Sequence, residues 1–183
     1  MAIETEKKYK IDPARRKEIV SELKEAGAEF EREDFETNTI YGGGTLDENM
    51  AVLRIRTTEN AALLTYKKRI ENRFDVKQQI EVETKCDDPD ALAEIITNLG
   101  FSPRVVYEKR RQIWRFRSVE IVLDELPFGQ FMEIEGSITS IKEAEMILGF
   151  EDLEVEHETY PRMTMRLGEK KDDIFEARFQ RKL

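Results

Sequence analysis

Acidic and basic residues recur as i, i+2 pairs within segments that have the composition of β-strands. Side chains alternate between the two faces of a strand, so both members of each pair lie on one face. Carboxylates grouped in this way favour Mg²⁺, Mn²⁺ or Ca²⁺, because these ions prefer oxygen ligands. Grouped lysines and arginines favour polyanions. The pairs are Glu4 and Glu6, Arg54 and Arg56, Glu81 and Glu83, Lys109 and Arg111, and Glu133 and Glu135.

Pairs of both signs in one chain indicate a site for a metal–polyphosphate complex. Basic side chains would hold phosphoryl oxygens, while carboxylates would hold a metal that neutralises developing charge and activates a water. Two more lysines fit this pattern, since Lys8 is in phase with Glu4 and Glu6, and Lys67 is in phase with Thr65. The alternative is a half-buried sheet whose charges simply face water, which is the usual place for charged side chains.

The strand faces opposite the charged pairs favour the first interpretation, because several of them are strongly apolar and must pack on something. If helices cover these apolar faces from outside, the charged faces point into the interior of the sheet. An interior lined by charge is stable only when each sign has a partner, and both signs are present. The apolar pairs are Leu53 and Ile55, Ile80 and Val82, and Met132 and Ile134.

The elements that must position these residues are mainly strands. β-branched and aromatic residues with period-2 alternation predict eight strands, and Asp-Pro starts and Gly stops predict short helices between them. We therefore expect an α+β fold, mainly antiparallel, in which eight strands close into a β-barrel with helices packed outside. The predicted strands are 2–10, 35–41, 50–57, 61–69, 74–85, 104–117, 119–125 and 130–136, and the predicted helices are 13–26, 89–99, 140–148 and 159–167.

Length and composition limit the classes of protein that remain. The 183 residues suit one domain, which we place at 1–167, followed by a charged tail or peripheral helix at 168–183. The net charge of −9 argues against binding a nucleic-acid polymer. No stretch approaches the apolar length of a membrane span, so no membrane partner is expected. A single cysteine and a single histidine favour a soluble protein of the reducing cytoplasm and exclude cysteine-rich zinc sites.

Six motifs, in this order, resemble those of the CYTH superfamily, the triphosphate tunnel metalloenzymes. The resemblance covers about residues 1–167, and each motif has the required strand phase. One departure is the turn at 127–129, which is Pro-Phe-Gly where the family often has a bulky residue followed by glycine. The motifs are ETEKK at 4–8, LRIR at 53–56, LTYKK at 64–68, QIEVE at 79–83, EKRR at 108–111 and LDELPFGQFMEIEG at 123–136.

The resemblance implies a tunnel inside an eight-stranded antiparallel barrel, with residues assigned by position in the motifs. Catalytic roles fall to Glu81, Glu83 and Lys8, where the two glutamates hold a second metal or the attacking water, and the general base stays open. Mg²⁺ or Mn²⁺ is the implied cofactor, with Glu4, Glu6, Asp124, Glu133 and Glu135 as ligands. The implied triphosphate-binding residues are Lys8, Arg54, Arg56, Lys67, Lys109 and Arg111.

Two reactions fit such a tunnel, and we favour hydrolysis of inorganic triphosphate or a small organic triphosphate, because no adenine-reading motif is evident. The alternative is a class IV adenylate cyclase that converts ATP to cyclic AMP and pyrophosphate, which residues 160–167 resemble. A non-catalytic polyphosphate- or nucleotide-binding protein and a purely structural barrel are further alternatives. The expected partner is a small molecule such as inorganic triphosphate, ATP or thiamine triphosphate, bound by a monomer or homodimer.

Overall fold

The computed structural model describes residues 2–70 and 76–180, which form ten strands and five helices. The strands are β1 (Ala2–Ile11), β2 (Glu29–Gly42), β3 (Ala51–Thr57), β4 (Ala62–Ile70), β5 (Lys77–Cys86), β6 (Ser102–Phe116), β7 (Val119–Leu126), β8 (Gly129–Glu135), β9 (Glu169–Lys171) and β10 (Ile174–Ala177). The helices are α1 (Pro13–Glu25), α2 (Gly44–Glu48), α3 (Pro89–Asn98), α4 (Ile138–Leu148) and α5 (Tyr160–Leu167).

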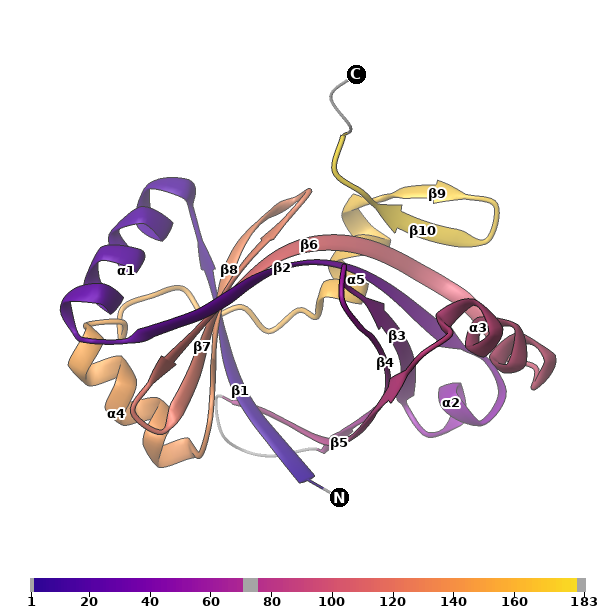
Figure 1. Ribbon diagram of the computed structural model, residues 1–183, viewed down its shortest axis with the longest axis horizontal. Coiled ribbons are helices and arrows are strands. Elements are labelled where there is room, and N and C mark those ends of the chain that lie inside the picture. The colour runs from indigo at the N-terminus through magenta and orange to yellow at the C-terminus, as the bar shows by residue number, and fades with distance from the viewer. Residues whose placement is uncertain (1, 71–75, 181–183) are drawn as a thin grey trace.

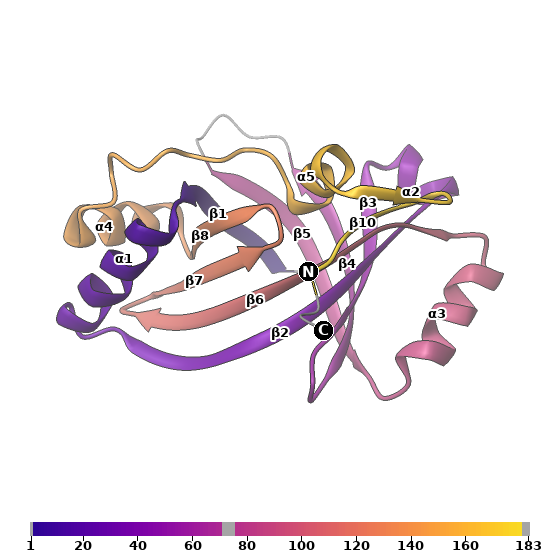
Figure 2. The ribbon, with the colours of Figure 1, turned by 90° about the horizontal axis from the view of Figure 1, so that it is seen from above.

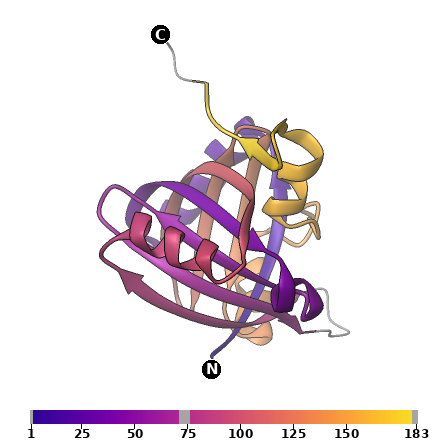
Figure 3. The same ribbon diagram turned by 90° about the vertical axis from the view of Figure 1, so that its right-hand side faces the viewer.

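Eight of the strands form a closed ring, because the first strand of the series, β2, also pairs with the last, β6. The order is β2-β3-β4-β5-β1-β8-β7-β6, and β6 then pairs with β2 over almost its whole length. Every pairing within the ring is antiparallel. The strands curve around a common interior (Figures 1 and 3). The prediction of eight mainly antiparallel strands that close on themselves is confirmed.

Helices cover two parts of the outer surface of the ring. In Figures 1 and 2, α1 and α4 lie together on one side, outside β1, β7 and β8, while α3 lies at the opposite end. Ile19 and Leu23 of α1 and Ile141 of α4 are completely buried in one apolar cluster with outward-facing strand residues such as Met132 and Ile134. The outer faces predicted to be apolar are therefore packed against helices here, and the charged faces point inward.

The cover is incomplete over β5 and the start of β1. Val82 and Ile3 are 51% and 63% exposed there. The expectation that a helix covers Ile80 and Val82 is therefore wrong at Val82, because α3 packs instead beside β3, where Ile96 contacts the cluster of Tyr41 and Ile55. Within residues 2–70 and 76–180, no helix is long and apolar enough to cross a membrane.

Local sequence signals set most element boundaries. Asp12 caps α1, since its carboxylate accepts from the backbone N–H groups of Ala14 and Arg15. The predicted start of the third helix near Ser140 is wrong, because Ser137 is the cap and accepts from the Ser140 N–H. The second strand begins at Glu29 and not at residue 35, because its polar first half pairs with β6.

The C-terminal segment differs from its prediction. Residues 168–183 were expected to be a charged tail or a peripheral helix, but 169–177 form the hairpin β9–β10. β10 pairs in parallel with β6, which places Phe175 beside Val105 and Ala177 beside Tyr107. A hairpin of so few apolar residues is stable here because β6 provides a free edge for backbone pairing beyond the end of β7. Residues 181–183 lie outside the described chain.

Gly168 allows the chain to pass from α5 into this hairpin. A Cβ at this position would lie 2.6 Å from the carbonyl oxygen of Thr164 and still closer to that of Glu176. Because both obstacles are backbone atoms, we expect Gly168→Ala to destabilise the protein by about 1–3 kcal/mol, measured by denaturant unfolding. Glu169→Ala, an exposed neighbour, is the control. Equal stability of Gly168→Ala and wild type would contradict this packing.

Candidate active site

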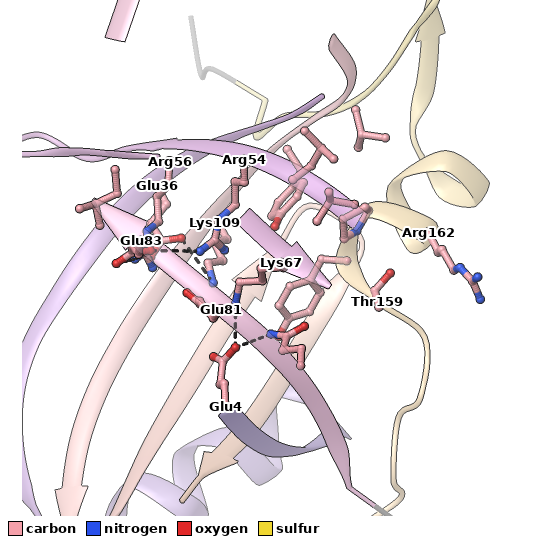
Figure 4. Close-up of a pocket in the computed structure, with 18 of the residues that line it drawn as sticks. Glu4, Glu36, Arg54, Arg56, Lys67, Glu81, Glu83, Lys109, Thr159 and Arg162 are labelled. Carbon is pink, nitrogen blue, oxygen red and sulfur yellow. Dashed lines mark hydrogen bonds and ion pairs between the residues drawn. The ribbon is translucent and has the colours of Figure 1, made fainter. Parts of the chain in front are cut away.

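A cavity of about 1250 Å³ lies inside the ring, and every one of the eight ring strands contributes charged side chains to its wall. The alternation along each strand explains this, because the inward positions carry the i, i+2 pairs seen in the sequence. Figure 4 shows carboxylates and cations from different strands pointing toward one another across the wall. The structure brings the following predicted residues to this cavity: Glu4, Glu6, Lys8, Arg54, Arg56, Lys67, Glu81, Glu83, Lys109, Arg111, Glu133 and Glu135.

Asp124 is the one predicted site residue that lies behind the wall. It is completely buried, and its carboxylate is paired with cations. Arg111 donates to both of its oxygens, at 2.7 and 2.5 Å, and Lys109 Nζ lies 3.2 Å from Oδ2. Tyr160 donates its hydroxyl proton to the same Oδ2 at 2.9 Å. Burial alone would raise the pKa of Asp124, but Arg111 and Lys109 lower it below its usual value. Asp124 therefore fixes the position of two cations at the wall.

A second group of charged side chains forms ion pairs between β2, β3 and β5. Arg56 lies 3.5 Å from Glu36 and 3.1 Å from Glu83. Arg54 donates to the hydroxyl of Thr65 at 3.2 Å, and Thr65 in turn donates to Glu83 at 2.8 Å. The two arginines are thus held side by side by groups that leave much of their donor capacity available to a ligand.

Glu36 links this group to the cations on β6. Its carboxylate lies 3.4 Å from Lys109 Nζ, and both side chains are only 2% exposed. Although burial opposes ionisation of Glu36, the charges of Lys109, Arg111 and Arg56 lower its pKa to about 2. The glutamate is therefore ionised at neutral pH and compensates the buried cations around it.

Lys67 connects two of the predicted acids. Its Nζ lies 3.0 Å from Glu4 and 2.5 Å from Glu81, and Gln79 also donates to Glu4. Burial raises the pKa of Glu81 to about 7, and its hydrogen bond with Glu4 acts in the same direction. Glu4 is the ionised partner, because Glu81, Lys67 and Gln79 outweigh the effect of burial on its pKa.

Lys8 is held differently from the other cations. Its ammonium donates to the backbone carbonyl of Glu158 and lies 4.4 Å from the ring centre of Tyr160. Within the described chain, no carboxylate lies within ion-pair distance of Lys8, and burial lowers its pKa. A carbonyl and an aromatic face satisfy the lysine only partly, so it can bind an additional anion.

Glu135 of β8 lies near other carboxylates, which gives this part of the cavity wall an excess of negative charge. Burial raises its pKa to about 7, and the nearby carboxylates of Glu4, Glu120 and Glu6 raise it further. Glu6 has a cation, Lys77, at 2.8 Å, whereas no ion pair to Glu135 is formed in residues 2–70 and 76–180. A divalent cation would relieve this repulsion, so the donor set fits a hard metal ion.

The side chains are not yet arranged around such an ion. Among the described residues, no group of three or more His, Cys, Asp or Glu side chains has metal-binding geometry. The carboxylates of Glu4 and Glu6 are turned toward Lys67 and Lys77 instead. A metal at this place would therefore require these acids to exchange a lysine for the ion.

Several residues of the site were missed by sequence reasoning. Glu36 is in phase with Asn38 and Ile40 on an alternating strand, which is a signal that could have been used. Lys77 and Gln79 extend the alternation of Glu81 and can be found in the same way. From the sequence, residues 160–167 are noted only as a resemblance, with no role in the site for Tyr160, which reaches the cavity because α5 docks against β6.

Comparison with known proteins gives consistent matches over most of the chain. The family model described as the CYTH domain matches residues 2–163. A Methanocaldococcus jannaschii protein whose name proposes an adenylate cyclase is 31% identical over 149 residues, which are 80% of this chain and 83% of that protein.

Solved structures share the fold. The PH1012 protein from Pyrococcus horikoshii has a TM-score of 0.75 at 24% identity, covering 87% of this chain and 98% of its own. A Hippeastrum protein, HpAC1, is described as a proposed adenylyl cyclase with a dominant triphosphatase activity. It has a TM-score of 0.67 at 16% identity and covers 94% of this chain and 98% of its own.

Proposed function

This chain belongs to the CYTH domain family, and on that premise we propose that it is an enzyme that hydrolyses a triphosphate bound inside the ring of strands. The proposed substrate is inorganic triphosphate or a small organic triphosphate. The observation that carries the proposal is the convergence of six cations from β1, β3, β4 and β6 on one cavity. Those cations are Lys8, Arg54, Arg56, Lys67, Lys109 and Arg111.

The proposed binding mode uses the cations as fixed hydrogen-bond donors. Arg54 and Arg56 face the cavity beside each other, and Lys109 and Arg111 are held in place by Asp124. Preorganised donors of this kind stabilise charge without reorganising during the reaction, which is the main protein contribution to phosphoryl transfer.

The cofactor we propose is Mg²⁺ or Mn²⁺, held by carboxylates at the acidic part of the wall. Glu135, Glu4 and Glu6 are the first candidates because their mutual repulsion is uncompensated at Glu135. Glu133 lies close to them but bonds Arg111 at 2.7 Å. Asp124 would contribute only by exchanging its cation partners. A bound ion would neutralise phosphoryl oxygens and polarise the attacking water.

The remaining acids are suited to orient a water molecule. Glu81 and Glu83 lie on the inner face of β5, each beside a cation proposed to hold the substrate. In hydrolysis, a water oxygen bonds to the terminal phosphorus, the bridging P–O bond breaks, and the water proton passes to one of these carboxylates. Lys8 would stabilise the charge on the leaving oxygen.

The second candidate function is cyclisation of ATP to cyclic AMP and pyrophosphate. The name of the Methanocaldococcus jannaschii relative favours it, whereas the triphosphatase activity described for the Hippeastrum protein favours hydrolysis. Both reactions need the same anchoring of phosphates, and they differ in which phosphorus is attacked.

A turnover panel tests the proposal and separates the two reactions. The purified protein is incubated with inorganic triphosphate, ATP or thiamine triphosphate in Mg²⁺ or Mn²⁺, and free phosphate and cyclic AMP are measured separately. We expect metal-dependent release of phosphate. Cyclic AMP as the main product would establish the alternative, and absence of both products with every substrate would reject the enzyme proposal.

Arg54→Ala tests the phosphate-binding role directly. Loss of a charged donor from the cavity wall should raise the KM for inorganic triphosphate by about 10- to 100-fold. Leu53→Ala is the matched control, because Leu53 precedes Arg54 on β3 and packs on the outer side near Ile96. Equal changes in KM for the two variants would show that Arg54 does not bind the substrate.

Location and assembly remain predictions from the sequence. We propose a cytoplasmic protein, on the ground of its single cysteine. We further propose that it acts as a monomer or homodimer, which sedimentation analysis can determine.

A further inference from the structure

A row of side chains crosses five strands at one level of the cavity. The register aligns Arg54 of β3 with Ile40 of β2, Ile40 with Val105 of β6, Val105 with Phe175 of β10, and Phe175 with Lys170 of β9. Paired positions on neighbouring strands point to the same face of a sheet. All five residues line the cavity.

The chemistry changes along this row. Arg54 is one of the cations proposed to hold phosphate, and the next three residues are apolar. Ile40 and Val105 are only 5% and 2% exposed, so they form the buried base of the row, and Phe175 carries its accessible apolar face. Since neighbouring strands are about 4.8 Å apart, the face of Phe175 lies three strand spacings, roughly 14 Å, from Arg54.

The far end of the row is provided by a segment that follows the part of the chain matched by the family model. The family model ends at residue 163, whereas Lys170 and Phe175 belong to the hairpin β9–β10. The hairpin lies beside β6 at one end of the ring (Figures 1 and 3). Its two cavity residues therefore lie outside the stretch that the family model matches.

The hairpin is held firmly enough to serve as a wall. Ala177 is buried in an apolar cluster with Val105. The chain that follows remains attached to β6, because Glu108 accepts from the backbone N–H of Phe179 at 2.9 Å, and Arg110 lies 4.3 Å from the ring centre of Phe179.

Phe175 and Lys170 still have capacity for a ligand. Phe175 is only half-buried, and Lys170 is exposed, with its Nζ 5.8 Å from the ring centre of Phe175. No carboxylate is within ion-pair distance of Lys170 in residues 2–70 and 76–180. An aromatic face with an adjacent free cation suits a planar, electron-rich group.

We propose that the hairpin residues Phe175 and Lys170 form a subsite for a planar aromatic group attached to the triphosphate. The preferred substrate is then an organic triphosphate, such as a nucleoside triphosphate, and inorganic triphosphate is bound less tightly. This inference rests on the proposed function, because it assumes that the triphosphate lies at Arg54.

The test compares binding of inorganic triphosphate with binding of ATP, GTP, CTP and thiamine triphosphate, measured by calorimetry without divalent metal so that no turnover occurs. We expect at least one organic triphosphate to bind the wild-type protein more tightly than inorganic triphosphate. Phe175→Ala should weaken that organic ligand about tenfold, as expected for loss of one stacking partner, and should change the affinity for inorganic triphosphate less than twofold.

Two further variants exclude a general effect on the hairpin. Lys171→Ala changes a hairpin residue next to Lys170 whose side chain faces the other side of β9, and it should leave both affinities unchanged. Phe175→Tyr keeps the aromatic face and should bind the organic ligand like the wild type.

The outcomes separate this inference from the proposed function. If Phe175→Ala weakens both classes of ligand equally, or neither, the subsite is wrong while triphosphate binding stands. The subsite is also wrong if inorganic triphosphate binds the wild type best. If no triphosphate binds the wild type, the proposed function and the subsite fail together.

Discussion

The double variant Glu4→Gln with Glu6→Gln is expected to lose metal-dependent turnover by about 10³-fold or more, since a catalytic metal supplies several kcal/mol to the transition state. Both side chains lie on the inner face of β1 at the cavity wall. Glutamine keeps their size and can still accept hydrogen bonds from Lys67 and Lys77, but it lacks the charge that holds a divalent ion. Turnover is measured over a range of Mn²⁺ concentrations, with Mn²⁺ binding measured separately by electron paramagnetic resonance.

The control variant also replaces two glutamates by glutamines, but at positions that do not line the cavity. Glu33→Gln with Glu125→Gln removes two carboxylates from β2 and β7, where one bonds Gln112 and the other lies 3.4 Å from Arg110. This variant should bind Mn²⁺ and turn over substrate like the wild type. If the variant at Glu4 and Glu6 retains full activity, these residues do not hold the metal.

Asp124→Asn is expected to lower the free energy of unfolding by about 3–5 kcal/mol, the usual cost of removing one partner of a buried ion pair. The reason is that Arg111 and Lys109 would keep their buried charges without the carboxylate that now compensates both. The isosteric asparagine leaves no cavity, so the loss would be electrostatic. Urea unfolding followed by circular dichroism gives the free energy.

Glu125→Gln is the matched control for this prediction, because Glu125 follows Asp124 on β7 but forms a half-exposed ion pair with Arg110. Its substitution should cost about 0–1 kcal/mol. If Asp124→Asn and Glu125→Gln unfold at the same urea concentration, Asp124 is not the residue that stabilises the buried cations.

The composition of the cavity wall could be predicted because strand periodicity assigns every side chain to a face. Once residues 53–56 and 79–83 are recognised as strands, the charged residues of each strand share one face and the apolar residues share the other. In a closed ring with the charges inside, the apolar face lies outside, although no helix covers it at Val82. The same reasoning located Lys109 and Arg111, and all of these residues line one cavity.

Pairing between side chains could not be predicted in this way. The sequence does not reveal that Asp124 is enclosed by Arg111, Lys109 and Tyr160, because the contacts depend on how β6, β7 and α5 meet in space. Nor does it reveal the hairpin at 169–177, whose few apolar residues carry a weak strand signal. Pairing with the edge of β6 stabilises that hairpin, and this is a tertiary effect.

A crystal structure of the protein with inorganic triphosphate, grown without divalent metal, tests the account most directly. We predict that the anion lies inside the ring, with phosphoryl oxygens within hydrogen-bond distance of Arg54 and of at least one of Lys109 and Arg111. A triphosphate bound only on the outer surface, with the interior cations still paired to Glu36, Glu83 and Asp124 alone, would contradict the account.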